Sequence, residues 1–251
     1  MWTVEEVKSE SSLYEGPIWR VVEVQSVKAT ARITDGDEEQ HILESILEET
    51  KPPIPENCSE LDFLLFTPFR YGPEPTGSRF RRVGQEDGAF YGAESAETAI
   101  AELAFLQLLF YLESPETTLP SRPVEKTAFP VNCSASHIDL TQSPFDQKRA
   151  LWEDPVDYRA CQDIADIARS AELQAIRSKS VRDPDGGYNV TLLTPTAFSG
   201  DIEQGELARN AQTWTIFIRD KTVQVWREFP RHSREYLWTD LGNDPRVVPK
   251  N

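Results

Sequence analysis

One stretch, residues 77–112, constrains the fold more than any other part of the chain. It reads GSRFRRVGQEDGAFYGAESAETAIAELAFLQLLFYL, which places an arginine cluster, a short aromatic segment and a long apolar segment in succession. A strand is predicted over 89–91, ending at Gly92, and Ser95 is a suitable N-cap for the helix that follows. The apolar positions that cover most of the helix circumference are Ala99, Ile100, Leu103, Leu106, Leu109 and Phe110. A helix with this pattern is expected to be largely buried.

Glu102 is the anomaly in this helix, because it lies inside the apolar arc of the helical wheel. An ionised carboxylate is costly to bury without a partner. Three arginines that are nearby in sequence could supply one: Arg79, Arg81 and Arg82. Two interpretations follow. In the first, Glu102 is structural: it belongs to an ion pair or lies at the rim of the core. In the second, it is a functional carboxylate at the floor of a cleft, with Tyr91 and an arginine facing it.

Composition narrows the class of protein. The chain has 251 residues, of which 39% are hydrophobic, and this suits one large domain or one domain with extensions. The net charge of −16 disfavours direct binding to nucleic acid or to an anionic membrane. Residues 1–10 lack the features of a signal peptide, and no apolar run is long enough to span a bilayer.

The cysteines and histidines exclude further classes. Three widely separated cysteines argue against a disulfide framework and a zinc site, and favour a reducing cytoplasm. The three histidines are not at ligand spacing, and the motifs GxSxG, HExxH, Walker A, CxxC and GxGxxG are absent. We therefore expect no metal and no Ser-His-Asp mechanism, which leaves chemistry by arginine, tyrosine, glutamate and serine.

Periodicity and turn signals predict the remaining elements. Strands are predicted over 18–22, 61–69, 128–131, 137–140, 189–193, 214–218 and 223–227, with another starting at 175, and helices over 41–50 and 158–173. Residues 143–155 are expected to form a loop with Trp152 packed, and residues after 231 a charged tail that serves partner binding or packing.

Four pieces in order resemble the RES-domain family, named for Arg, Glu and Ser residues. They are GSRF at 77–80, YGAE at 91–94, ETAIAE at 97–102 and SVRDPDGG at 180–187. The resemblance covers roughly residues 15–200. It implies the toxin of a bacterial toxin–antitoxin pair and a fold similar to that of ADP-ribosyltransferase toxins. That fold is α+β, with a mixed, mostly antiparallel sheet core and flanking helices.

Within this fold we expect three segments that form one compact domain. Residues 1–58 are an N-terminal extension with the first strand and an inserted helix, residues 59–213 are the RES core, and residues 214–251 are a C-terminal hairpin and tail. The insertion and the hairpin are departures from the usual form of the family.

The resemblance implies that NAD is degraded. Cleavage of the nicotinamide–ribose bond passes through a ribosyl oxocarbenium cation, which a nearby carboxylate stabilises. The catalytic residues are therefore expected to be Glu102, Tyr91 and Arg79. The enzyme is expected to be an NAD phosphorylase or an NAD glycohydrolase, since the acceptor is phosphate in some family members and water in others.

Binding of the dinucleotide needs fixed positive charge for the pyrophosphate, which arginine supplies better than lysine. Arg79 fits this role, with Arg20 or Arg70 behind it. In the family an arginine near the first strand lines the pocket; Arg20 is the preferred match, and Arg70 stays open as the second. Tyr91 is expected to orient the nicotinamide, and Ser180 to donate a hydrogen bond to a ribose, phosphate or carboxamide oxygen.

The partners expected from the resemblance are NAD as substrate, phosphate as a possible co-substrate, and a helix-turn-helix antitoxin of the Xre type. No separate cofactor is expected, and a homodimer stays open. Two other functions compete with NAD cleavage to a small product. One is transfer of ADP-ribose to a protein, and the other is a noncatalytic module that binds an ADP-ribose-like ligand or a protein.

Overall fold

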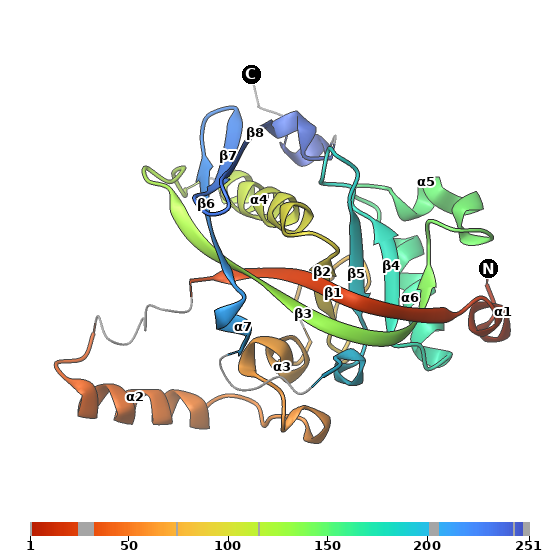
Figure 1. Ribbon diagram of the computed structural model, residues 1–251, viewed down its shortest axis with the longest axis horizontal. Helices are drawn as coiled ribbons and strands as arrows, with labels where there is room; N and C mark the ends of the chain where they lie inside the picture. The colour runs from red at the N-terminus through yellow and green to blue at the C-terminus, as the bar shows by residue number, and fades with distance from the viewer. Residues whose placement is uncertain are drawn as a thin grey trace.

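The computed structural model describes residues 2–24, 33–73, 75–114, 116–200, 206–242 and 244–247. Their centre is an eight-stranded sheet in the order β1-β2-β5-β4-β3-β6-β7-β8 (Figure 1). The strands are β1 (Ser12–Glu23), β2 (Phe90–Ala93), β3 (Val124–Asp139), β4 (Ala175–Lys179), β5 (Tyr188–Leu192), β6 (Gln212–Ile218), β7 (Thr222–Arg227) and β8 (His232–Leu237). Strands β3 and β4 run parallel, and the other pairings of the described strands are antiparallel.

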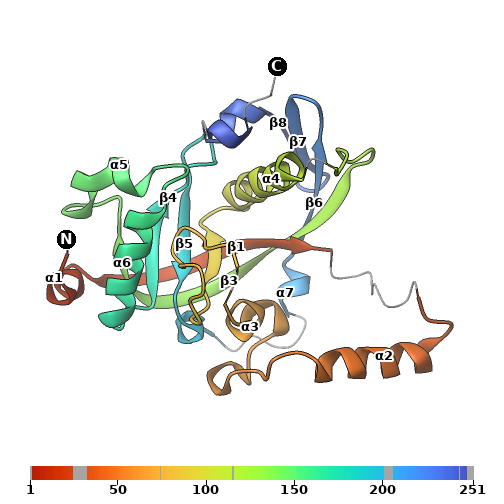
Figure 2. The same ribbon diagram turned by 180° about the vertical axis from the view of Figure 1, so that it is seen from behind.

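Helices flank the sheet on several sides (Figures 1 and 2). They are α1 (Val4–Ser9), α2 (Asp37–Glu49), α3 (Phe63–Arg70), α4 (Ala96–Glu113), α5 (Arg149–Trp152), α6 (Arg159–Ser170) and α7 (Glu206–Arg209), with short 3₁₀ turns η2 (Glu56–Cys58), η3 (Phe145–Lys148), η4 (Pro195–Ala197), η5 (Trp238–Asp240) and η6 (Pro245–Val247). The predicted α+β class, with a mixed and mostly antiparallel sheet and flanking helices, is confirmed. No helix in these described ranges is long and apolar enough to cross a bilayer.

Part of the sheet closes on itself. Strand β1 pairs with β3 along its whole length as well as with β2, so that β1, β2, β5, β4 and β3 form a ring. Alternate side chains of a strand point to opposite faces. One set, which includes Ile18, Phe90 and Val190, forms the cluster inside the ring. We call the opposite side, on which α4 and α6 pack, the outer face.

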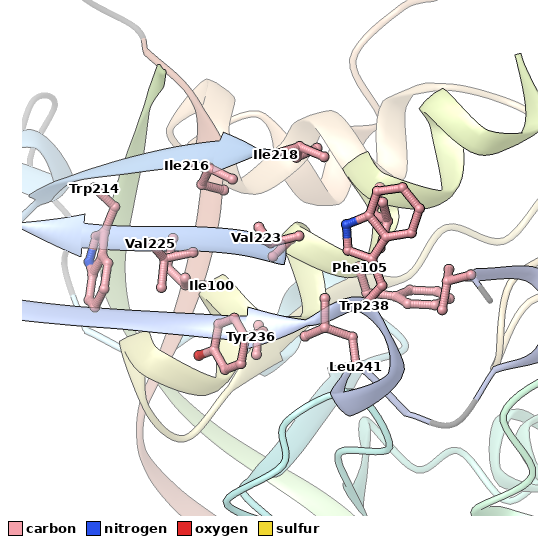
Figure 3. Close-up of a cluster of buried hydrophobic side chains, with 14 of the residues drawn as sticks. Ile100, Phe105, Trp214, Ile216, Ile218, Val223, Val225, Tyr236, Trp238 and Leu241 are labelled. Atoms are coloured by element: carbon pink, nitrogen blue, oxygen red, sulfur yellow. The ribbon is translucent and has the colours of Figure 1, made fainter. Parts of the chain in front are cut away.

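The C-terminal strands extend this sheet and cover α4. Strand β6 pairs with β3, and β7 and β8 follow in antiparallel order. Figure 3 shows that side chains such as Trp214, Val223 and Tyr236 pack against Ile100 and Phe105 of α4. Burial of several large apolar side chains at about 1.5–3 kcal/mol each is the main force that holds α4 in place.

The prediction of a strand over 61–69 is wrong, because this segment forms α3. The side chain of Asp62 accepts a hydrogen bond from the Leu64 amide and so caps the helix N-terminus. Leu64, Leu65 and Phe69 follow Leu61 by three, four and eight positions and so lie on one helical face. Together with Leu61 they pack against the cluster inside the ring.

Three further predictions need correction. The two strands predicted over 128–131 and 137–140 are parts of one continuous strand, β3. The predicted loop over 143–155 contains η3 and α5, although Trp152 is packed as expected. The expected tail after residue 231 begins with strand β8, and Tyr236 and Trp238 are buried in the core.

Candidate functional site

Glu102 lies near the middle of α4, half-buried against the outer face of the ring. Its Oε1 accepts two hydrogen bonds, from Ser180 Oγ at 2.6 Å and from Asn189 Nδ2 at 2.6 Å. Among the described residues, no group bonds to Oε2 and no guanidinium forms an ion pair with Glu102. The ion-pair interpretation is therefore wrong, because neutral donors compensate the buried half of the carboxylate and leave its other oxygen available.

Ser180 is oriented toward Glu102 by the backbone that follows β4. Its Oγ accepts hydrogen bonds from the amides of Arg182, at 3.2 Å, and Asp183, at 3.0 Å. Because the oxygen accepts from these two donors, its own hydrogen is directed at the carboxylate of Glu102. The predicted contact of Ser180 with a ligand remains a prediction, whereas its contact with Glu102 is a feature that sequence reasoning missed.

The turn after Ser180 is attached to the first turn of α4. Asp183 Oδ2 accepts a hydrogen bond from Thr98 Oγ1 at 2.8 Å and another from the Gly187 amide at 3.3 Å. A Cβ atom at position 187 would lie 2.0 Å from Thr98 Oγ1, so only glycine allows this approach. The SVRDPDGG segment thus joins α4 to the end of β4 and fixes the relative positions of Ser180 and Glu102.

Polar side chains without partners line the outer face beside Glu102. Ser178 pairs across the strands with Asn189, and Thr191 lies two residues further along β5, so the three share one face. Asn189 Oδ1, Thr191 Oγ1 and Ser178 Oγ are all buried and have no hydrogen-bond partner among the described residues. Buried polar atoms are nearly always hydrogen-bonded in proteins, so this row is an exceptional feature beside Glu102, and Ser178 and Thr191 are closed off from solvent. The only signal in the sequence is polar residues in an otherwise apolar strand.

Tyr91 stands on the same face, across from Thr191 in the β2–β5 pairing. Its hydroxyl lies 2.7 Å from Ser78 Oγ and accepts a hydrogen bond from the Phe80 amide at 3.2 Å. Burial raises the pKa of Tyr91, although the bond to Ser78 and the charge of Arg79 oppose this shift. The phenol is therefore neutral at physiological pH and anchors the loop that holds Arg79.

Arg79 reaches from this loop toward the start of α6. Its Nη1 donates to the carbonyl oxygen of Trp152 at 2.6 Å, and its guanidinium lies 5.0 Å from the ring centre of Tyr158. It makes no ion pair with a described carboxylate. The structure thus gathers four predicted residues, Glu102, Tyr91, Arg79 and Ser180, on the outer face.

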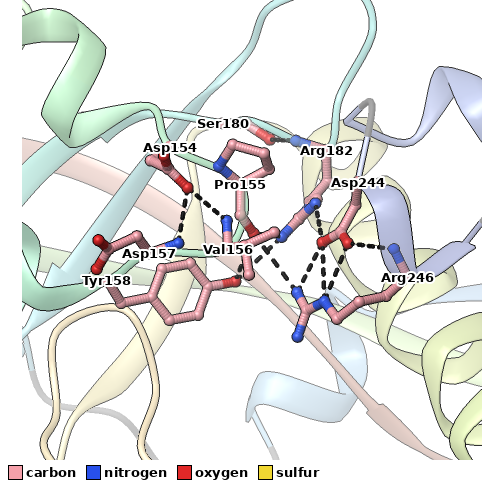
Figure 4. Close-up of polar contacts among 9 residues, drawn as sticks. All are labelled: Asp154, Pro155, Val156, Asp157, Tyr158, Ser180, Arg182, Asp244 and Arg246. Atoms are coloured by element: carbon pink, nitrogen blue, oxygen red, sulfur yellow. Dashed lines mark hydrogen bonds and ion pairs between the residues drawn. The ribbon is translucent and has the colours of Figure 1, made fainter.

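A buried charged cluster that the sequence did not indicate adjoins this surface (Figure 4). Arg182, almost fully buried, stacks 3.6 Å above the ring of Phe105 and donates to the hydroxyl of Tyr158 at 3.0 Å. Its Nη1 also lies 3.1 Å from Asp244, whose fully buried carboxylate forms a second ion pair with Arg246 at 2.6 Å. Two guanidinium groups therefore share one buried carboxylate in this cluster, close in the chain to Ser180.

Arg20 lies on the other side of the sheet. Its neighbours Trp19 and Val21 pack with the cluster beneath α4, so Arg20 points into the ring, where its guanidinium lies 4.5 Å from the ring centre of Phe90. The structure thus corrects the prediction that Arg20 lines the pocket with Glu102. Burial lowers its pKa to about 10, and among the described residues its Nη1 has no hydrogen-bond partner.

We expect replacement of Arg20 by methionine to raise the free energy of unfolding by about 1–2 kcal/mol. The methionine fills a similar volume and removes a buried charge that forms no ion pair with a described residue. Urea unfolding at neutral pH measures the difference, and the exposed Arg122 replaced by methionine is the control. A destabilised Arg20→Met protein would contradict this account of Arg20.

Arg70, the second candidate for the pocket arginine, is also placed elsewhere. Its Nε donates to the carbonyl oxygen of Pro52 at 2.7 Å, and its Nη1 pairs with Glu48 at 2.6 Å. These contacts join α3 to the end of α2, far from Glu102. Neither Arg20 nor Arg70 therefore lies behind Arg79 in the candidate site. The arginine closest to Ser180 in the sequence is Arg182.

The described residues contain no group of three His, Cys, Asp or Glu side chains arranged to hold a metal ion. The outer face offers one half-buried carboxylate, Glu102, together with arginines and with hydroxyl and amide groups.

Comparison with known proteins gives one family match. The RES domain family model matches residues 55–217, a range that includes Arg79, Tyr91, Glu102 and Ser180 but not Arg20. No curated protein matches the chain. Among solved structures, the M. tuberculosis MbcT–MbcA toxin–antitoxin complex is similar at 12% identity and a TM-score of 0.43, over 78% of this chain and 88% of that chain.

Proposed function

This chain belongs to the RES domain family, and we propose that it is a toxin that cleaves the nicotinamide–ribose bond of NAD. The observation that supports the proposal best is the state of Glu102. Two neutral donors fix one carboxylate oxygen, and no described residue bonds to the other. A carboxylate held in this way is oriented before the substrate arrives.

In the proposed reaction the bond between ribose C1′ and the nicotinamide nitrogen breaks. Its electron pair stays with nicotinamide, which leaves as a neutral molecule, and the ribose becomes an oxocarbenium cation. Oε2 of Glu102 stabilises that cation directly or through a hydrogen bond to a ribose hydroxyl. Because the carboxylate is half-buried, its interaction with a developing positive charge is stronger than it would be in water.

The remaining residues of the outer face are proposed to bind the dinucleotide. Arg79 has guanidinium nitrogens left to bind the pyrophosphate, beyond the one bonded to Trp152. Tyr91 forms an aromatic wall for the nicotinamide.

The acceptor is proposed to be phosphate or water. Phosphorus NMR of NAD with the purified protein, with and without inorganic phosphate, separates the two. Phosphorolysis gives ADP-ribose phosphate plus nicotinamide and requires phosphate, whereas hydrolysis gives ADP-ribose in both samples. Label from ADP-ribose on a macromolecule would instead select a protein ADP-ribosyltransferase. Binding of NAD without turnover would select the noncatalytic module, and NAD left intact and unbound by the folded protein would refute the proposal.

Ser180→Ala and Asn189→Ala are each expected to lower kcat by about 10- to 100-fold with little change in KM. Each removes one of the two groups that orient Glu102, and small misplacements of a catalytic group have effects of this size. Steady-state rates of NAD consumption over a range of NAD concentrations give kcat and KM separately for each variant. Ser170→Ala, at an exposed serine on α6, is the matched control. A change confined to KM would mean that Ser180 and Asn189 only bind substrate.

We further propose a helix-turn-helix antitoxin of the Xre type as the partner that neutralises the toxin in the cytoplasm. Expression of this chain alone should deplete cellular NAD and stop growth, and expression together with the antitoxin should prevent both. Depletion that persists with an antitoxin bound would contradict this part of the proposal.

A further inference from the structure

Helix α2 has an apolar stripe that the described residues leave uncovered. The helix lies apart from the sheet in both views (Figures 1 and 2). Ile42, Ile46 and Leu47 are 56%, 53% and 44% exposed. An amphipathic helix of a globular protein normally turns its apolar side to the core. In α2 three of the four apolar side chains are exposed to solvent instead, which is typical of an interaction surface.

The helix is nevertheless attached at a defined position. Arg70 of α3 pairs with Glu48 in the last turn of α2 and donates to the carbonyl oxygen of Pro52 just beyond it. The guanidinium of Arg70 is itself well buried, so this connection is partly shielded from water. Polar contacts therefore hold α2 to the body, and its apolar side chains are left for another function.

The charge of α2 restricts what can bind there. Its 13 residues include six carboxylates and no lysine or arginine. Shortly after α2, Pro55 and Asn57 line a hollow of about 710 Å³. Its charged lining consists of three exposed carboxylates and one partly buried arginine: Glu86, Asp87, Glu172 and Arg169. The acidic character of α2 therefore continues along the neighbouring surface.

We propose that α2 is a docking helix for a basic protein partner. The partner's face would present apolar side chains to Ile42 and Ile46, flanked by lysines or arginines that meet the carboxylates of α2. A second copy of this chain is a poor occupant, because it would bring the same carboxylates and a net charge of −16 against them. The surface is separate from the outer face with Glu102, so the inference does not depend on the proposed reaction.

The test uses a fluorescent, helical, amphipathic peptide of leucine and lysine. A peptide with the same pattern, in which glutamate replaces lysine, is the control for charge. Fluorescence anisotropy measures their binding to the full-length protein and to the double variant Ile42→Ser/Ile46→Ser. Serine has a helix propensity close to that of isoleucine, and circular dichroism checks that the variant is folded. We expect the lysine peptide to bind the wild-type protein at least about tenfold more tightly than the variant, and the glutamate peptide to bind neither.

The matched control is Phe229→Ser/Leu237→Ser, which removes two exposed apolar side chains from the C-terminal hairpin. It should leave the affinity for the lysine peptide unchanged. Equal affinity of the wild-type protein and the Ile42→Ser/Ile46→Ser variant would overturn the proposal, because it would mean attraction by charge alone. Dimerisation of the wild-type chain that the α2 variant abolishes, measured by light scattering, would also overturn it and would identify a second copy as the occupant.

Discussion

Glu102→Gln is expected to lower the rate of NAD cleavage by about 100- to 1,000-fold. Glutamine keeps the shape of the side chain, and its carbonyl oxygen can accept the hydrogen bonds that Ser180 and Asn189 now donate to Oε1. The fold should therefore be retained while the negative charge opposite the oxocarbenium cation is lost. The rate of nicotinamide release, followed at saturating NAD, measures the effect.

Glu113→Gln is the control for this variant, because it makes the same change at an exposed position at the end of α4. It should cleave NAD at the rate of the wild-type protein. Thermal unfolding of both variants confirms that they are folded. A folded Glu102→Gln protein with wild-type activity would show that the reaction takes place elsewhere or does not use this carboxylate.

Asp244→Asn is expected to lower the free energy of unfolding by about 3–5 kcal/mol, since removal of one partner leaves a buried charge uncompensated. Arg182 and Arg246 both pair with this carboxylate, and Arg182 is almost fully buried. Urea unfolding at neutral pH measures the loss. Asp220→Asn, at the exposed turn between β6 and β7, is the control and should change stability by no more than about 0.5 kcal/mol.

The stabilisation by Asp244 should depend on pH in a defined direction. Burial by itself raises the pKa of Asp244, but the hydrogen bonds from Arg246 and the charge of Arg182 outweigh it, so the pKa lies below its ordinary value. The stabilisation is then complete above the unfolded pKa of about 3.9 and is lost as the pH falls through the lower folded value. The difference between wild type and Asp244→Asn should be constant from neutral pH to about 5 and should shrink in stronger acid. A difference that grows in acid would contradict the assignment.

Most elements of the fold could be predicted from local patterns. Ser95 predicted the start of α4 correctly, and its side chain accepts a hydrogen bond from the Thr98 amide. The pattern of α3 resembles that of a strand because its apolar residues are nearly continuous. The signals that indicate a helix are the cap at Asp62 and the spacing of apolar residues from Leu61. The position of α2 relative to the sheet could not be predicted from local patterns, because it depends on the contact of Arg70 with Glu48.

The candidate site was predictable where a residue conflicts with its own local pattern. Glu102 in an apolar arc is such a conflict, and the structure resolves it through Ser180 and Asn189. That neither Arg20 nor Arg70 lies beside Glu102 could not be predicted. It depends on which face of β1 points into the ring and on the contacts of Arg70 with the end of α2. The pairing of Arg182 with Asp244 was equally hidden, since nothing near either residue indicates the other.

The pairing of β1 with β3 sets how this chain must fold. Ser12 lies opposite His137 and Glu23 opposite Lys126, so the ladder joins residues more than a hundred positions apart in the chain. A long segment must therefore be brought together before these strands gain any of their hydrogen bonds, and chains rich in such distant contacts fold slowly. Helix α4 needs only local contacts to begin, so we expect closure of the ring, and not formation of the helix, to limit the rate of folding.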